Sequence, residues 1–226
     1  MNIEKCKIQH TNAIIIGEKK ENAFLFVHGQ AGNKEEAIRF ANIAVPLGYQ
    51  VIGIDLSVMD VPWNVLPKLL EVKDFLKEHY STISLRANSI GCWYSLLAFE
   101  NEKIEQALFV SPILDMKRFV DGMKEKDEQY YEWVVLHQIA NWSNKTYILR
   151  AEKDLVVSDK VNETFINQFM CNVVTLKDSE HWLHTPEQLS SLRKWEESVL
   201  KQQYDDTQIH LPQRLPACNE AMHPGL

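Results

Sequence analysis

The sequence predicts an α/β fold in which helices flank a mostly parallel central sheet, and three observations support this. Short apolar runs such as Ala23–Val27 are continuous rather than alternating, which suits strands that helices cover on both faces. An amphipathic segment, Lys34–Ala44, separates this run from the next one at Tyr49–Leu56. A strand, a helix and a strand at this spacing form a βαβ unit, whose crossover makes the two strands parallel. The length of 226 residues fits one domain of this kind.

The composition is that of a globular protein without nucleic-acid or membrane partners. The formal net charge is −7 and the 24 Lys and Arg residues are scattered, so the chain offers no basic stripe for phosphates. No apolar run approaches the ~18 residues of a membrane-spanning helix. The stretch Met1–Lys7 contains no apolar signal core. The four cysteines form no C-x-x-C pair, which favours reduced thiols and a cytoplasmic location.

The first half of the chain supplies the next predicted elements in order. Residues 5–18 alternate loosely, which suggests a hairpin of edge strands. Pro46-Leu47-Gly48 ends the first amphipathic helix. After a loop over Ser57–Trp63, apolar residues recur at helical spacing from Asn64 to His79. Pro67 then lies in the first turn of this helix, where proline is tolerated.

The second half of the chain continues the alternation. Three compact apolar runs predict strands at Glu105–Pro112, Lys145–Ala151 and Asn172–Leu176. A helix is predicted from about Ser158 to Phe169. The final helix begins at Thr185-Pro186-Glu187-Gln188, which combines an N-cap, a proline at the first helical position and a glutamine three residues after the cap. We expect it to end at about Gln203.

Two segments depart from this alternation. Residues 113–143 are charged and aromatic, and we predict one or two helices there that form a short helical cap over the sheet. The aromatic residues of the cap either line an acyl or alcohol pocket or pack the cap onto the sheet, and the pattern fits both. Residues 205–226 contain three prolines and little periodicity. They predict an irregular or disordered tail that follows a single domain over residues 1–204.

The chain is organised around a strand-to-helix turn at Ser89. Ile83–Arg86 is predicted to be a short buried strand, and an apolar helix follows. Between them lies Ala87-Asn88-Ser89-Ile90-Gly91, a small-x-Ser-x-Gly pattern. A sharp turn there lifts the Ser89 hydroxyl to the surface, and small residues two positions before and after it avoid a collision with the neighbouring strand. Taken alone, the pattern also fits an ordinary turn or a helix N-cap.

Residues of types that often take part in catalysis follow several of the predicted strands. Ser89, Asp154 and His181 each come after a strand, and His28-Gly29-Gln30 follows an earlier one. Ligands bind at the carboxyl ends of the strands in open parallel sheets. From Ala23 to Gln203, the order Ser, Asp, His and these motifs resemble the α/β-hydrolase fold of small serine esterases. In that fold the strand-to-helix turn with the serine is called the nucleophile elbow, and its strict pattern is Gly-x-Ser-x-Gly; Ala87 stands at the first glycine position, although alanine is also small.

The resemblance assigns the chemistry to three side chains. Ser89 would attack a carbonyl carbon, since a hydroxyl becomes nucleophilic when a base lies within hydrogen-bond reach. His181, in Glu180-His181-Trp182, would be that base, and Asp154, in Glu152-Lys153-Asp154, would orient its ring and stabilise the imidazolium. Alternatives exist nearby: Asp178 and Glu152 are rivals for the carboxylate, and His184 is the rival for the base.

The resemblance also assigns supporting positions. The backbone N–H groups of Gln30 and Ile90 would bind the oxyanion, and Gly29 would let their loop approach closely. His28 is expected to hold that loop by hydrogen bonds, and Cys92 is expected in the core. No group of His, Cys and Asp has metal-ligand spacing, and the glycines form no phosphate loop or dinucleotide fingerprint. No metal and no cofactor are therefore expected.

The sequence thus predicts a serine hydrolase that cleaves a small-molecule carboxylic ester or thioester through an acyl-enzyme. A serine, a histidine and an aspartate also catalyse the reactions of peptidases, amidases and acyltransferases, so these activities are alternatives to ester hydrolysis. The rival from another class is a non-catalytic ligand-binding protein of the same fold, although such proteins usually lose a triad member. A dehalogenase or an epoxide hydrolase would need an aspartate in place of Ser89.

Overall fold

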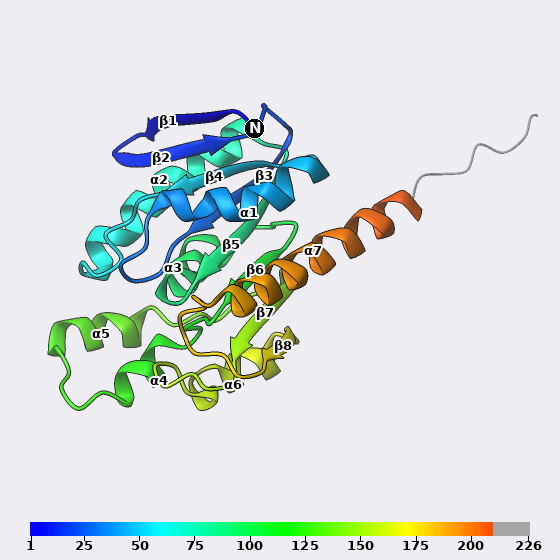
Figure 1. The fold of residues 1–226 in the computed structure, drawn as a ribbon. Helices are drawn as coiled ribbons and strands as arrows, with labels where there is room; N and C mark the ends of the chain where they lie inside the picture. The colour runs from blue at the N-terminus through cyan, green and yellow to red at the C-terminus, as the bar shows by residue number, and fades with distance from the viewer. Residues whose placement is uncertain (210–226) are drawn as a thin grey trace, which may run out of the picture.

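The computed structural model describes residues 1–209 and places eight strands in one sheet (Figure 1). The strands are β1 (Ile3–Ile8), β2 (Thr11–Ile16), β3 (Asn22–Val27), β4 (Gln50–Ile54), β5 (Thr82–Asn88), β6 (Ala107–Val110), β7 (Thr146–Ala151) and β8 (Asn172–Leu176). Their order across the sheet is β1-β2-β4-β3-β5-β6-β7-β8. The pairs β1–β2 and β2–β4 are antiparallel, and the remaining pairs of this sheet are parallel. The predicted edge hairpin and mostly parallel sheet are confirmed.

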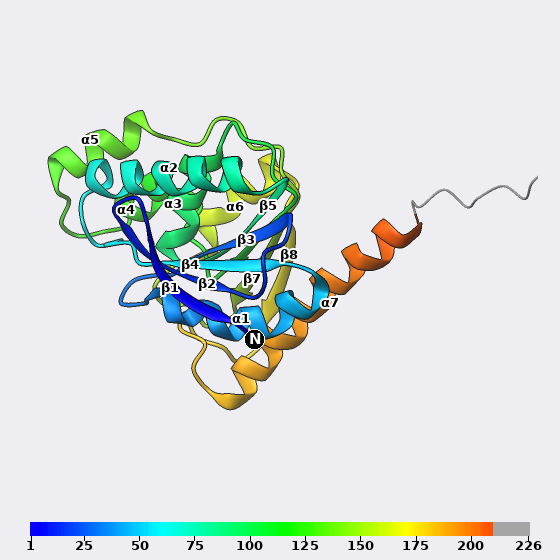
Figure 2. The same cartoon turned by 90° about the horizontal axis from the view of Figure 1, so that it is seen from above.

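Helices cover both faces of the sheet (Figure 2). One face carries α1 (Ala37–Ala44) and α7 (Pro186–Ile209), and the other carries α2 (Pro62–His79), α3 (Ile90–Phe99) and α6 (Asp159–Gln168). Each face has its own apolar core of strand and helix side chains. β4 and β6 are buried at every position because both of their faces meet these cores. This double burial explains the continuous apolar runs in the sequence.

The first two helices begin differently from the prediction. A 3₁₀ turn over Lys34–Glu36 precedes α1, and the side chain of Asn33 caps this turn by accepting a backbone N–H. α2 begins at Pro62 rather than at Asn64, so Pro67 lies inside the helix and not in its first turn. Proline at the start of α2 has a φ that suits a first helical residue, which explains the earlier start.

The last helix is longer than the sequence predicts. Its start has the expected capping box, because Thr185 Oγ1 accepts the Gln188 N–H while the Gln188 side chain accepts the Thr185 N–H. α7 continues past Gln203 to Ile209, since no proline or glycine interrupts it there. The first part of the predicted irregular tail, 205–226, is therefore helical, and the part from residue 210 lies outside the described residues. Within residues 1–209, no helix has the length and apolar character needed to cross a bilayer.

Two short helices form the predicted cap, α4 (Met116–Asp121) and α5 (Glu128–Leu136). Asp121 joins them, because its carboxylate accepts hydrogen bonds from Lys117, Lys126 and Tyr131. These bonds, the one from Lys117 first, hold the pKa of Asp121 well below its usual range. The two helices are thus tied to each other at the charged edge of the cap.

The aromatic residues of the cap fill both of the roles that the sequence leaves open. Phe119 and Tyr130 line a cavity beside Ser89. Trp133 instead packs edge-on against Trp93 of α3, with ring centroids 5.8 Å apart. Trp133 therefore anchors the cap to α3, while Phe119 and Tyr130 shape a binding space beside Ser89.

Candidate active site

Ser89 lies on a sharp turn between β5 and α3. Its φ of +50° and ψ of −124° are a conformation that side-chain-bearing residues rarely adopt. A hydrogen bond from the Ser89 N–H to the Val110 carbonyl oxygen, 3.0 Å long, ties the turn to β6. Ala87 is fully buried, and a Cβ on Gly91 would collide with the His28 carbonyl oxygen. Space alone therefore demands glycine at position 91, and the small Ala87 is buried on the other side of the turn.

We expect Gly91→Ala to lower the free energy of unfolding by at least about 2 kcal/mol, because the added methyl group meets backbone that cannot move aside. The unfolding midpoint in urea measures this change. Gly122→Ala is the matched control, since an added Cβ there has its nearest neighbour 3.4 Å away and φ is −79°. Equal midpoints for the two variants would contradict the close approach at Gly91.

The structure brings Ser89, His181 and Asp154 into one hydrogen-bonded row. Ser89 Oγ lies 2.9 Å from His181 Nε2, and His181 Nδ1 lies 2.7 Å from Asp154 Oδ2. The three residues follow β5, β8 and β7, whose carboxyl ends lie along one edge of the sheet. This arrangement makes Nε2 an acceptor for the Ser89 hydroxyl proton and places a carboxylate on the far ring nitrogen.

Asp154 is held in its charged form by several donors. Its Oδ1 accepts the backbone N–H groups of Val156 and Val157 at 2.9 and 2.8 Å, while Oδ2 accepts from His181. Burial alone would raise the pKa of Asp154, but the hydrogen bonds, from His181 first, lower it below its ordinary value. The side chain is only 9% exposed, so it faces His181 as a buried, oriented carboxylate.

The rival acidic and basic residues point elsewhere. Asp178 is exposed and forms an ion pair with Lys153 at 2.6 Å, and Glu152 accepts the Asp178 backbone N–H. His184 lies at the entry to α7, where its backbone N–H donates to the Gln188 side chain. Neither rival carboxylate has a hydrogen bond to His181 within residues 1–209.

The loop after β3 lies directly against Ser89. His28 is buried, its Nδ1 donates to the Gly29 carbonyl oxygen at 2.7 Å, and its Nε2 accepts the Leu56 N–H at 3.1 Å. A Cβ on Gly29 would lie 3.1 Å from the Ser89 Cβ, so glycine lets the loop approach this closely. Both ring nitrogens of His28 are thereby occupied in holding the loop.

Gln30 and Ile90, the expected oxyanion donors, both lie beside Ser89. The Ile90 N–H is at the first position of α3, where an N–H has no acceptor within the helix. No described residue accepts a backbone N–H from Gln30. Both residues line the same cavity as Ser89 and His181. Two backbone donors are therefore available next to the hydroxyl, one of them at the positive end of a helix dipole. Cys92, farther along α3, is buried as expected, and burial raises its thiol pKa.

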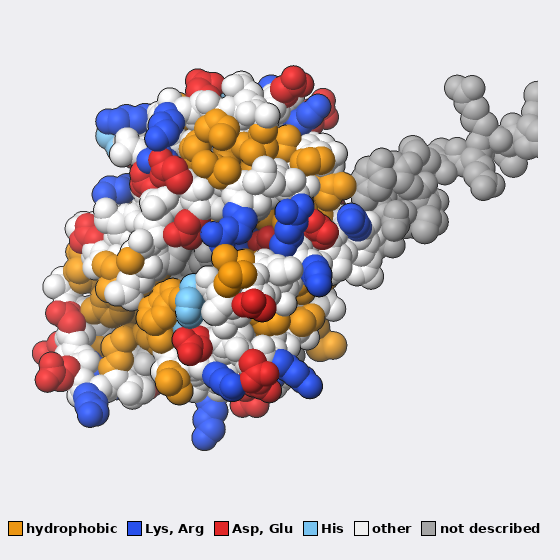
Figure 3. Space-filling view, viewed as in Figure 1, with side chains coloured by type: hydrophobic (Ala, Val, Ile, Leu, Met, Phe, Trp, Pro, Cys, Tyr) orange, Lys and Arg blue, Asp and Glu red, His pale blue; other side chains and the backbone are white. Residues whose placement is uncertain are grey.

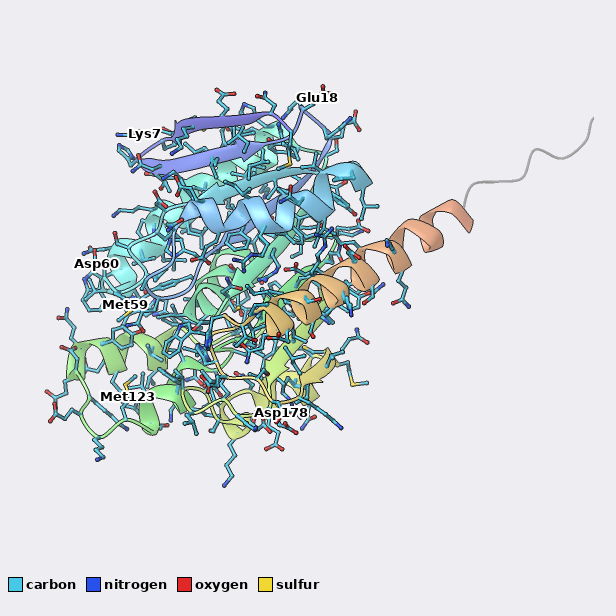
Figure 4. The ribbon with its side chains drawn as sticks, in the orientation of Figure 1. Lys7, Glu18, Met59, Asp60, Met123 and Asp178 are labelled. Carbon is cyan, nitrogen blue, oxygen red and sulfur yellow. The ribbon has the colours of Figure 1, made fainter. Side chains whose placement is uncertain are left out.

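Two cavities meet at Ser89. The first, here called the cap cavity, has a volume of about 280 Å³. Its lining is mainly apolar and includes Ile113, Met116, Phe119, Val120, Met123, Tyr130 and Met59. Figure 4 labels Met59, in the loop before α2, and Met123, in the segment after α4; both are exposed at this cavity. An apolar group of a ligand fits this side.

The second cavity, here called the polar cavity, has a volume of about 300 Å³ and lies toward α1 and α7. Arg86 of β5 and Glu196 of α7 line it and form a buried ion pair, with Nε and Oε1 2.7 Å apart. Burial raises the pKa of Glu196, although Arg86 and then Arg39 act in the opposite direction. In Figure 3, hydrophobic side chains gather on the α4–α5 side of this face, and charged side chains lie over α1 and α7.

Sequence reasoning missed the residues that shape the polar cavity. Arg86 and Glu196 meet only because α7 packs over β5, so local patterns do not connect them. The sequence did offer one indication of this pair: Arg86 lies inside the apolar run of β5, and a buried arginine needs an oppositely charged or hydrogen-bonding partner. Trp182, which is 58% exposed, lines both cavities and packs edge-on against His181. Its position directly after His181 in the sequence could have indicated that it lies at the site.

Comparison with solved structures identifies the fold. Est1E from Butyrivibrio proteoclasticus superposes with a TM-score of 0.75 at 17% identity, over 91% of this chain and 100% of that one. Alpha/beta hydrolase domain-containing protein 10 from mouse gives 0.68 at 13% identity, over 92% and 100%. The esterase PF2001 from Pyrococcus furiosus gives 0.62 at 15% identity, over 90% and 91%. No protein-family model and no curated protein matches the sequence. The chain therefore has the α/β-hydrolase fold.

Proposed function

We propose that this protein is a serine hydrolase that cleaves a small carboxylic ester or thioester through an acyl-enzyme. The observation that carries the proposal is the continuous row of hydrogen bonds from Ser89 Oγ through His181 to Asp154. A serine, a histidine and a carboxylate in this order activate a hydroxyl for attack on a carbonyl carbon. The fold supports the proposal, because serine hydrolases and esterases are among its solved examples.

In the acylation half of the reaction, Ser89 Oγ attacks the carbonyl carbon while its proton moves to His181 Nε2. Asp154 stabilises the imidazolium that forms and keeps Nδ1 as the donor. The carbonyl oxygen becomes an oxyanion, which the backbone N–H groups of Gln30 and Ile90 bind. The intermediate then collapses, His181 gives its proton to the departing alcohol or thiol, and the acyl group stays on Ser89.

In the second half, water repeats these steps. His181 takes a proton from water, whose oxygen attacks the acyl carbon, and the same N–H groups bind the second oxyanion. Collapse releases the carboxylic acid and returns the proton to Ser89 Oγ. The cycle consumes one ester and one water and leaves the protein unchanged.

Pre-steady-state hydrolysis of a 4-nitrophenyl ester tests this scheme. We expect a rapid burst of about one 4-nitrophenolate per chain, followed by a slower steady rate, because the acyl group occupies Ser89 until water removes it. Mass spectrometry of the quenched protein should then find the acyl mass on the peptide that contains Ser89. Turnover with the acyl mass on another residue would contradict the scheme.

A further inference from the structure

The proposed mechanism gives no task to the charged residues of the polar cavity. A buried ion pair is costly to desolvate and by itself is weak support for a fold. Arg86 Nε donates to Glu196 Oε1, and its Nη1 donates to the Ala87 carbonyl oxygen and to Asn88 Oδ1 at 2.9 and 2.6 Å. Arg86 Nη2 and Glu196 Oε2 have no hydrogen bond to any residue in the described range. Because both residues line the cavity, two donor hydrogens and an acceptor remain for an occupant.

The rim of the polar cavity adds a further arginine and a further glutamate, that is, more hydrogen-bond donors and acceptors. Arg39 of α1 lines the cavity, and its guanidinium makes no hydrogen bond or ion pair with a residue that the structure describes. Glu36 also lines it and accepts from Asn88 Nδ2 at 3.4 Å. Two arginines and two glutamates give a lining with no net charge. The carboxylates would repel an anion, and the guanidinium groups would repel a cation. Neutral hydroxyls can donate hydrogen bonds to the carboxylates and accept them from the guanidinium groups.

We propose that the polar cavity is a subsite for a neutral group with several hydroxyls, such as a glycerol-like or sugar-like half of the substrate. The cap cavity then takes an apolar half, and the ester lies between them at Ser89. Gln30, His181 and Trp182 line both cavities, so a single ester can occupy the two at once. The proposal rests on the proposed hydrolase function and adds the chemistry of its substrate.

Two matched pairs of esters test the subsite and show which half of the ester occupies it. The first pair, propyl hexanoate and 2,3-dihydroxypropyl hexanoate, differs only in hydroxyls on the alcohol. The second, hexyl propanoate and hexyl 2,3-dihydroxypropanoate, carries the same difference on the acyl group. We expect the dihydroxy member of one pair to have a kcat/KM at least about tenfold higher, because its partner leaves buried polar groups without hydrogen bonds.

Variants connect this preference to the cavity. Arg39→Gln should reduce the preference several-fold, and it is an exposed position where folding is not at risk. Glu196→Gln should also reduce the preference for the dihydroxy ester. Because Glu196 is buried, this variant is first shown to be folded. Arg193→Gln is the control, because Arg193 is an exposed residue of α7 that is paired with Glu197 and lies outside the cavity lining. This control should keep the wild-type preference.

The outcomes separate the subsite from the hydrolase function. A preference in one pair that falls in Arg39→Gln and is kept in Arg193→Gln supports the subsite. Turnover of all four esters with no preference in either pair overturns the subsite alone, as does a preference that both Arg39→Gln and Glu196→Gln leave intact. No turnover of any ester, together with no fluorophosphonate label on Ser89, overturns the hydrolase function, and the subsite falls with it.

Discussion

Replacing Ser89 by alanine is expected to lower kcat for ester hydrolysis by about 10⁶-fold, down to the rate that binding alone supports. In the proposed scheme the Ser89 hydroxyl oxygen forms the acyl bond, and no other described hydroxyl has a hydrogen bond to His181. Steady-state kinetics with a soluble ester measures the loss. A residual rate within tenfold of the wild type would mean that another group carries the reaction.

The loss should not come from unfolding. Ser89 has a strained φ of +50°, and its hydroxyl bonds only to His181 among the described residues. We therefore expect Ser89→Ala to change the free energy of unfolding by less than about 0.5 kcal/mol. Ser89→Gly should be more stable than the wild type by about 1 kcal/mol, because glycine adopts positive φ without strain. An inactive but more stable Ser89→Gly protein would show that strain is kept at this turn for function.

The second large effect is expected at Asp154, where asparagine should lower kcat by about 10⁴-fold. Two backbone N–H groups, from Val156 and Val157, hold Oδ1, so the amide nitrogen of asparagine would take the place of Oδ2 and face His181. An N–H facing Nδ1 favours the tautomer in which Nε2 carries the hydrogen. That ring cannot accept the Ser89 proton. Asp178→Asn, at an exposed ion pair, is the matched control and should stay within about twofold of wild type.

Asp154 should also contribute to stability in a pH-dependent way. Its pKa is lowered in the folded protein, so the folded state favours the ionised carboxylate more than the unfolded state does. This contribution is present above the unfolded pKa of about 3.9 and is lost as the pH falls through the lower folded value. Urea unfolding across acidic pH should therefore show a shallower acid dependence for Asp154→Asn than for wild type. Parallel curves would contradict the lowered pKa.

Local sequence signals account for most of the fold and for the row of three side chains. Continuous apolar runs marked the buried strands, because β4 and β6 are covered on both faces. The turn at Ser89 could be predicted from the sequence because the space at Gly91 permits no side chain, which makes glycine a visible marker of the turn. Asp154 could be chosen over Asp178 because Asp178 lies only three residues before His181 on the same loop, and His181 over His184 because His184 directly precedes the Thr185 cap of the last helix.

What the sequence did not reveal depends on long-range packing. The Arg86–Glu196 pair forms where α7 crosses the sheet, and no periodicity links positions so far apart. The last helix was predicted to end at about Gln203 rather than Ile209, because the apolar periodicity fades there, although Pro212 follows Ile209 by three residues. The division of the cap aromatics between packing and cavity lining depends on how α4 and α5 sit on α3, which tertiary contacts decide.

The most direct test of an activated serine is covalent labelling of the purified protein with a fluorophosphonate probe, located by peptide mass spectrometry. We expect one label on Ser89 that is absent in Ser89→Ala and strongly reduced in His181→Ala, because Nε2 must take the Ser89 proton. A well-folded wild-type protein that takes no label, or takes it equally well without His181, would contradict the activation of Ser89 by His181.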